Sequence, residues 1–363
     1  AISSTLGGTP IWTGLAPSAT LAFIAAEIHF LSQPLAWWLL LPAAALLFAS
    51  VFAAVHHAET IAHRVGQPFG SIILALAVTV IEVSLIVSLL LSSPEGESTV
   101  ARDTVFSAIM IVLNGIVGLC LLIGGIRYHR QTVQAHSATA ALGVLGTLAV
   151  LALILPNYTK AVPGPLYAPA QLVFVAVVSL ALYGFFLYAQ TVRHRDDFND
   201  PLDDGASHGP VPRRTFFVGV GLLPVALLAV VLLAEILAVP VEHAIDGAGL
   251  PAALVGVAIA LVVLMPEGIA SIRAAKANRL QTSINLALGS ALASLCLTIP
   301  TVALISLALG QDLVLGLEAE HIVLLLLSLF RATLSLSTGR TTSLQGCIHL
   351  VIFCAFLTLS AVP

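Results

Sequence analysis

Long apolar runs dominate the pattern of this chain. They are about as long as the twenty or so residues that a helix needs to cross a bilayer, and short polar or Pro/Gly-rich breaks separate them. They lack the ten-residue alternation of a membrane β-strand, so helices are indicated. The pattern predicts eleven transmembrane helices, near residues 11–31, 35–56, 69–92, 103–126, 138–156, 168–190, 215–239, 251–272, 282–308, 320–338 and 343–361.

One polar insert divides these spans. Residues 193–214 are rich in Asp, Gly and Pro and follow the sixth span, so we expect an acidic linker there. We expect residues 1–33 to form an extra N-terminal helix, retained rather than cleaved, because no basic region or small-residue cleavage motif accompanies it. Residues 34–192 and 215–363 then each hold five spans.

The two sets of five spans share a weak internal repeat. The segment around Glu82 aligns with that around Glu267 at an offset of 185. In the next span an offset of 176 pairs Ser107 with Ser283, Asn114 with Ser290, Gly118 with Ser294 and Cys120 with Cys296. Because each set has an odd number of spans, the second set has the opposite orientation in the membrane to the first. The predicted fold is an all-α polytopic membrane protein with one extra helix and two inverted five-helix repeats, which is typical of secondary transporters.

Composition and charge support a membrane protein. Charged residues make up 9% of the 363 residues and hydrophobic ones 59%, whereas soluble domains carry about 25% charge. The net charge of −4 offers no basic patch for nucleic acid. We expect the four cysteines to be packing residues, because they lie in apolar runs without metal-type spacing. They are Cys120, Cys296, Cys347 and Cys354.

Basic residues fall unevenly on the two sides of the predicted helices. One side holds only Arg102 and Lys160. The other side collects Arg64, Arg127, Arg130, Arg193, Arg195, Arg213, Arg214, Arg273, Lys276, Arg279, Arg331 and Arg340. By the positive-inside rule the latter side is cytoplasmic. The N-terminus and the 193–214 linker are therefore expected inside and the C-terminus outside.

Glu82 and Glu267 are the leading candidates for chemistry. Glu82 lies about 18 Å into its span at 1.5 Å per residue, near the bilayer centre. An ionisable group there costs about 3 kcal/mol or more and usually faces a cavity or a partner. Glu267 follows Pro266, so we expect its helix to be kinked or broken, with freed carbonyls that can coordinate an ion. The alternative for each Glu is a protonated, hydrogen-bonded packing residue.

Oxygen-bearing side chains form stripes on the helices that follow. Helical spacing places Ser107, Asn114 and Gly118 on one face, and Ser283, Ser290 and Ser294 likewise. Such stripes either allow close packing or supply oxygen ligands for hard cations. We predict cation ligation by Glu82, Glu267, Thr79, Ser107, Asn114, Ser283, Ser290 and Ser294.

Two buried carboxylates also predict a mechanism. Desolvation and mutual repulsion favour their protonated forms, so protons and a cation compete for them. One Ca²⁺ or two protons both leave the pair neutral. Competition combined with alternating access gives antiport. His349, inside the last span, is a further candidate for proton coupling, or else a hydrogen-bonded packing residue.

Other ionisable groups carry weaker hypotheses. His56, Glu59 and His63 share a helical face, which fits a metal or pH-sensing site or, more simply, a solvated surface helix; their order is not HExxH. Glu235, near the outer end of its span, fits an entry path or, more simply, a residue at the membrane interface. The linker aspartates lack EF-hand spacing, which favours a solvated linker over a Ca²⁺ sensor. They are Asp196, Asp197, Asp200, Asp203 and Asp204.

Three segments carry a family resemblance. PFGSIILALAVTVIEVSLIVSLLL, VLMPEGIASIRAAKANRLQTSINLALGSALASLCLTIP and LSTGR resemble the bacterial calcium/sodium(potassium)–proton antiporters of the calcium/cation exchanger superfamily. The resemblance extends over essentially the whole chain. It implies an eleven-span inner-membrane transporter that expels Ca²⁺, and Na⁺ or K⁺, in exchange for protons. The family's paired glutamates fall on Glu82 and Glu267.

The same segments depart from that family's pattern. Calcium–proton exchangers carry Gly-Asn-Ala-x-Glu before each key carboxylate, whereas this chain has VTVIE and VLMPE. A Gln expected near Leu297 is also replaced. The loss of neutral oxygen ligands leaves a mainly monovalent Na⁺(K⁺)/H⁺ antiporter as the alternative.

The remaining expectations follow from this assignment. The partners are inorganic cations, protons and membrane lipid, with a homo-oligomer left open. No cofactor is expected, since the ions are cargo. The chain is then not an enzyme; the alternative from another class is an intramembrane metallohydrolase that uses His56, Glu59 and His63, for which no activating Glu lies in register.

Overall fold

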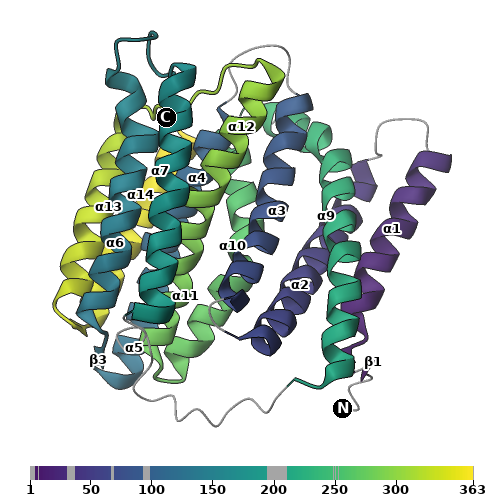
Figure 1. Cartoon of the computed structure of the whole chain (residues 1–363), viewed down its shortest axis with the longest axis horizontal. Coiled ribbons are helices and arrows are strands. Elements are labelled where there is room, and N and C mark those ends of the chain that lie inside the picture. Colours follow the sequence, from purple (N-terminus) through teal and green to yellow (C-terminus); the bar gives the residue numbers. More distant parts are fainter. Residues whose placement is uncertain are drawn as a thin grey trace. The chain divides into compact units, whose positions relative to one another are not determined.

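The computed structural model describes residues 5–6, 8–30, 37–66, 69–92, 99–193, 211–247, 249, 251 and 253–362. The chain divides into two compact units, and Figure 1 labels their elements. The first takes residues 1–94 and 205–249, and the second takes residues 95–204 and 250–363. Each unit therefore combines segments from before and after the linker.

The first unit is a group of helices around α2. Its elements are β1 (Thr5–Leu6), β2 (Thr9–Pro10), α1 (Trp12–Phe30), η1 (Trp37–Leu39), α2 (Leu40–Val65), α3 (Phe69–Ser92) and α9 (Arg213–Gly247). α2 packs against α1, α3 and α9. Its fully buried alanines, among them Ala43, Ala53 and Ala54, allow the close helix approach that small residues give in membranes.

The second unit contains the other helices and a two-stranded antiparallel sheet, β3–β4. Its elements before the linker are α4 (Val100–Met110), η2 (Ile111–Ile116), α5 (Val117–Tyr128), β3 (Gln131–Thr132), α6 (Ala135–Ala149), η3 (Val150–Ile154), η4 (Leu155–Tyr158), α7 (Pro169–Tyr188) and η5 (Ala189–Arg193). After the linker come α10 (Ala253–Lys276), α11 (Leu280–Ala293), η6 (Ser294–Thr298), α12 (Ile299–Leu309), α13 (Ala319–Ser337), β4 (Arg340–Thr341) and α14 (Ser343–Ala361).

Loops from distant parts of the sequence meet at each end of the second unit. At one end β3 pairs with β4, and Tyr128 Oη donates to the Lys276 carbonyl at 2.8 Å. At the other end Leu166 bridges to Val314, and Arg102 Nη1 donates to the Gly316 carbonyl at 3.1 Å. The loops thus alternate between the two ends as the spans predict, with Arg102 at the end that the charge count places outside.

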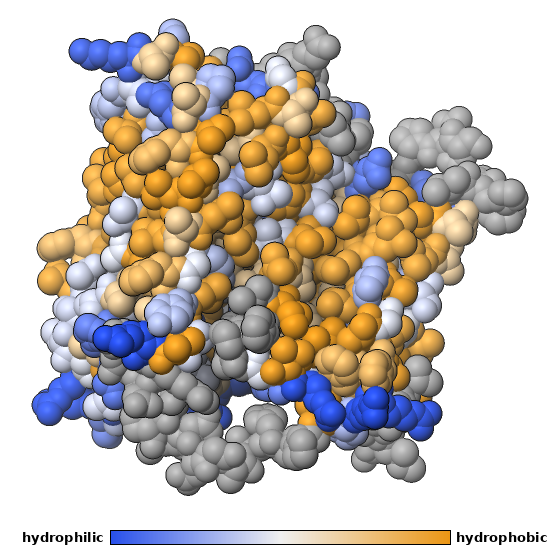
Figure 2. Space-filling model, in the orientation of Figure 1, coloured by the Kyte–Doolittle hydropathy of each residue, from blue (hydrophilic) through white to orange (hydrophobic). Residues whose placement is uncertain are grey.

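The described residues contain nine helices that are long and apolar enough to cross a membrane. Two helices of the first unit, α1 and α3, are not among these nine. α1 is 19 residues long, and the described apolar stretch of α3 is Ile73–Ser88. Exposed apolar side chains such as Phe174, Phe185 and Phe330 cover the helices, while the most hydrophilic residues gather near helix ends (Figure 2). The chain is an all-α polytopic membrane protein.

The sequence predicted a kink or a break at Pro266, and the break does not occur. α10 runs without interruption from Ala253 to Lys276 with Pro266 inside it. Proline removes one helical hydrogen bond, and the remaining bonds of this apolar helix keep the backbone helical. Irregular turns occur elsewhere, as π-helical segments at η2, η3, η5 and η6.

Candidate cation site

Glu267 is a buried carboxylate within an apolar helix. It lies on α10 and is 8% exposed. α10 packs against α4, η2, α5 and α11. A Cβ atom added at Gly268, the next residue, would lie 3.2 Å from Ile116 Cδ1 of η2. The absence of a side chain there lets this part of α10 lie close to η2.

Buried hydroxyl groups lie on α10 and on two helices that contact it. Ser107 on α4, Ser271 on α10 and Ser290 on α11 each have a buried Oγ without a hydrogen-bond partner. Ser271 lies four residues after Glu267, so the two share a helical face. Unsatisfied hydroxyls are costly away from water, and hard cations take such oxygens as ligands. Ser271 was not among the predicted ligands, although this spacing could have identified it.

Asn114 belongs to a hydrogen-bond network that joins three helical segments. Its Nδ2 donates to Ser328 Oγ of α13 at 2.8 Å, and its Oδ1 lies 3.2 Å from His349 Nδ1 of α14. His349 Nε2 lies 3.1 Å from Ser335 Oγ, which also receives Arg331 Nη2 at 3.3 Å.

This network assigns the tautomer of His349. Because Asn114 donates through Nδ2 to Ser328, its Oδ1 is the acceptor for a proton on His349 Nδ1. His349 Nε2 then accepts the Ser335 hydroxyl proton, and Ser335 Oγ accepts from Arg331. A neutral imidazole therefore satisfies the Asn114 Oδ1 acceptor and the Ser335 hydroxyl donor. The sequence had no signal for these partners, because Ser328 lies 214 residues from Asn114 and His349 lies 235 from it.

The other predicted ligands of the second unit are buried on neighbouring helices. Ser283 on α11 is fully buried, and its hydroxyl lies beside the Cys120 thiol of α5. Ser294 begins the π-helical segment η6 and is 3% exposed. At Gly118 an added Cβ would lie 3.0 Å from His349 Cβ, so this position packs against α14.

Glu82 lies in the first unit, on α3, and is 2% exposed. Thr79, one turn earlier, is 7% exposed and donates its hydroxyl proton to the Ala75 carbonyl at 2.8 Å. The Thr79 oxygen keeps its lone pairs, so it can still act as a ligand. α3 packs against α2 and α9 within this unit.

The weaker candidates do not assemble into a metal site. His56 packs its ring against Trp12, with centroids 6.3 Å apart. In the described part of the chain, His56, Glu59 and His63 are not among the groups whose ligand atoms converge. Glu235 is exposed, and the five linker aspartates lie outside the described residues.

Comparison with known proteins places this chain among transporters. The model of the sodium/calcium exchanger protein family matches residues 35–192 and 218–362. The chain is 53% identical over 358 residues to y4hA of Sinorhizobium fredii, described as an ionic transporter, with 98% of this chain and 97% of that one covered. It is 37% identical over 317 residues to the sodium-potassium/proton antiporter ChaA of Escherichia coli, with 86% and 85% covered.

A solved structure shares the fold. The crystal structure of the H⁺/Ca²⁺ exchanger CAX superposes with a TM-score of 0.73 and 17% identity, covering 97% of this chain and 89% of that one.

Proposed function

The chain belongs to the sodium/calcium exchanger protein family, within the calcium/cation exchanger superfamily, and from this membership we propose that it is a secondary active cation/proton antiporter. Its cargo is Ca²⁺, together with Na⁺ or K⁺, exported in exchange for H⁺ across a bacterial inner membrane. Members of this family are transporters and not enzymes, so a metallohydrolase is excluded and the ions are cargo rather than cofactors.

The observation that carries the mechanism is Glu267, buried in α10 beside helices with unsatisfied hydroxyls. A bare carboxylate in the bilayer interior costs about 3 kcal/mol or more. A proton or a cation removes that charge, so the two compete for one group. The buried hydroxyl groups of Ser107, Ser271 and Ser290 supply neutral oxygens that fit a hard cation.

Glu82 has the equivalent role in the repeat that precedes the linker. Binding of two protons or one Ca²⁺ leaves the two glutamates neutral together, and alternating access then moves only neutral forms of the pair. Thr79, Asn114, Ser283 and Ser294 are the further proposed oxygen ligands. His349 is the weaker proton-coupling candidate, because both of its ring nitrogens already have partners.

The architecture that we propose has eleven spans: α1 as the extra helix and two inverted sets of five. The π-helical segments η2 and η6 support the repeat, because each interrupts the third span of its set. The alternating loops of the second unit support the same span count. The excess of basic residues at the β3–β4 end supports a cytoplasmic location for that end.

A mainly monovalent Na⁺(K⁺)/H⁺ antiporter is the second candidate. It is favoured by 37% identity to a protein named as a sodium-potassium/proton antiporter. It is also favoured by the absence of an Asn from Val78–Ile81 and from Val263–Pro266, where calcium–proton exchangers carry one.

One assay tests the proposal and separates the two candidates. We expect everted membrane vesicles that contain the protein to lose an imposed proton gradient on addition of CaCl₂ and of NaCl or KCl, but not of choline chloride. A pH-sensitive dye reports this loss. A response to NaCl or KCl without one to CaCl₂ at alkaline pH would favour the monovalent exchanger. No response to any of these cations would refute cation/proton antiport.

A further inference from the structure

The start of α13 gathers three metal-ligating side chains that the transport mechanism does not use. Ligand atoms of Glu318, Glu320 and His321 all lie within 4.8 Å of one another. In the described part of the chain, no other three His, Cys, Asp or Glu residues meet in this way. They lie at the Arg102 end of the second unit, whereas Glu267 is in the middle of α10.

His321 is the residue that points to a ligand. It is 4% exposed, and neither Nδ1 nor Nε2 has a hydrogen-bond partner. Its ring packs on Phe106 of α4, with centroids 4.7 Å apart and planes at 37°. Buried polar groups almost always have a partner, because leaving them unsatisfied costs free energy. One ring nitrogen of His321 lies within 4.8 Å of carboxylate oxygens of Glu318 and Glu320. Ionised carboxylates accept hydrogen bonds but do not donate them, so they cannot satisfy this nitrogen when it is unprotonated.

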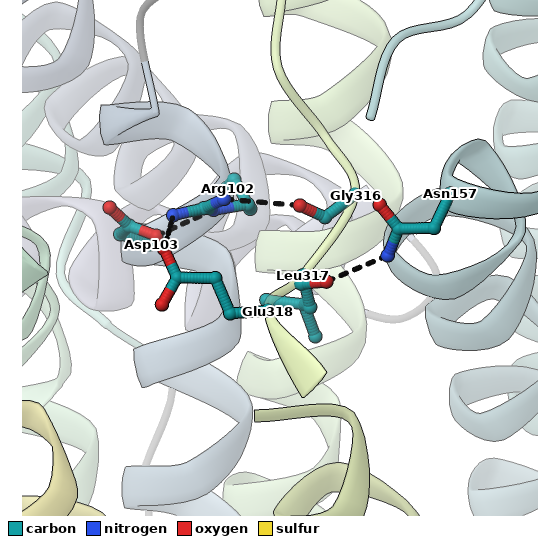
Figure 3. A network of polar contacts seen from close by, with 6 residues as sticks. All are labelled: Arg102, Asp103, Asn157, Gly316, Leu317 and Glu318. Carbon is teal, nitrogen blue, oxygen red and sulfur yellow. Dashed lines mark hydrogen bonds and ion pairs between the residues drawn. The ribbon is translucent and has the colours of Figure 1, made fainter. Parts of the chain in front are cut away.

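A rigid scaffold holds the backbone just before these residues (Figure 3). Arg102 Nε bonds Asp103 Oδ1 at 2.7 Å, and Arg102 Nη1 bonds the Gly316 carbonyl. Asn157 Nδ2 donates to the Leu317 carbonyl at 2.7 Å. Arg102 Nη2 also lies 3.5 Å from Glu318 Oε1, whose side chain is 54% exposed. The backbone before Glu318 is therefore held by hydrogen bonds at two carbonyls, while the Glu318 carboxylate is accessible to water.

The local charge favours a cation. Glu318, Glu320 and Asp103 carry three negative charges, and Arg102 is the positive partner named in these contacts. Coulomb attraction therefore draws a cation to the trio. An arriving ion competes with Arg102 for Glu318, and the Arg102–Glu318 contact at 3.5 Å is long for a charged hydrogen bond.

We propose that Glu318, Glu320 and His321 bind a divalent transition-metal ion of the Zn²⁺ class, at a site separate from the transport site. One imidazole nitrogen and two carboxylates suit Zn²⁺ and similar metals, whereas Ca²⁺ takes oxygen ligands only. Ligand atoms around tetrahedral Zn²⁺ lie roughly 3.3 Å apart. Glu318 is exposed and Glu320 partly so, which leaves their side chains room to rotate toward that separation. Water fills the open coordination position.

Calorimetry on the purified, tag-free protein in detergent tests the site directly. We expect ZnCl₂ to titrate one site per chain that the double variant Glu318→Gln/Glu320→Gln weakens at least tenfold. His321→Asn should have a similar effect. His129→Asn is the matched control, because His129 is exposed at the opposite end of the unit, and it should bind Zn²⁺ as the wild type does.

The Glu double variant also guards against misfolding, since Glu318 is exposed and Glu320 partly so. Its elution as the same monodisperse species as the wild type establishes that the fold is retained. Zn²⁺ binding of unchanged affinity and number in that variant would overturn the proposal. The absence of Zn²⁺ binding in the wild type would also overturn it. So would stoichiometric displacement of Zn²⁺ by an equal concentration of CaCl₂. Zn²⁺ binding at this site does not require cation/proton exchange, so the result of the vesicle assay neither supports nor contradicts it.

Discussion

At the scale of single residues, sequence reasoning located the buried polar groups but not their partners. The rarity of charge in apolar runs was enough to single out Glu82 and Glu267, and both are buried. Asn114 was also singled out, from its helical spacing to Ser107 and Gly118. Its bonds to Ser328 and His349 come from helices more than 200 residues away. No local pattern encodes such contacts. The cluster of Glu318, Glu320 and His321 was not predicted for a similar reason. His321 is buried against Phe106, which is distant in the sequence.

The His349 network gives a prediction at this scale. His349→Ala should leave Asn114 Oδ1 without a donor and the Ser335 hydroxyl proton without an acceptor in a dry interior, at a cost of about 1–3 kcal/mol for each buried group. We expect the apparent melting temperature in detergent to fall by several degrees in differential scanning fluorimetry. Leu344→Ala is the control, since this side chain on the same helix is 67% exposed. Equal melting temperatures for His349→Ala and the wild type would show that the network adds no stability.

At the scale of elements, hydropathy predicted where helices lie but not how their backbones vary. The expected span 251–272 became α10 at Ala253–Lys276, and 343–361 became α14 with the same bounds. Hydropathy reports a residue's preference for lipid and carries no information on hydrogen-bond register, so the π-helical turns were missed. Of the kink or break expected at Pro266, the break does not occur, because a single lost hydrogen bond does not end a long apolar helix.

Glycine contacts between α5 and α14 give a prediction for these elements. A Cβ at Gly346 would lie 2.4 Å from Leu122 N and 2.7 Å from the Gly118 carbonyl oxygen, both backbone atoms. Gly346→Ala therefore forces the two helices apart, and overpacking of this kind costs about 1–3 kcal/mol. The matched control is Gly143→Ala on α6, where an added Cβ meets nothing within 4 Å.

We expect Gly346→Ala, but not Gly143→Ala, to lower the yield of monodisperse protein and its melting temperature. Size-exclusion chromatography and scanning fluorimetry report the two quantities. If both variants behaved alike, the close contact of α5 with α14 would be refuted.

At the scale of the whole molecule, the helical membrane architecture was predicted mainly from composition and from the long apolar runs. A charged fraction of 9% excluded a soluble protein, and the helical membrane architecture and the family assignment agree with that expectation. The sequence did not predict that compact units combine segments from both sides of the linker. Such units depend on long-range helix contacts, which hydrophobic periodicity does not encode. The two-repeat architecture stays a prediction.

The most direct test of the central claim is cation/proton exchange by proteoliposomes that contain Glu82→Gln or Glu267→Gln. Gln keeps the size of the side chain but cannot exchange a proton for a cation. Glu235→Gln is the matched control, because Glu235 is exposed on α9. Chromatography of each variant first establishes that it is folded. With a pH-sensitive dye inside the liposomes, we expect the wild type and Glu235→Gln to move protons on addition of CaCl₂ or NaCl. Each of the other two variants should lose at least about 90% of that rate, whereas exchange at the wild-type rate by either one would contradict the account.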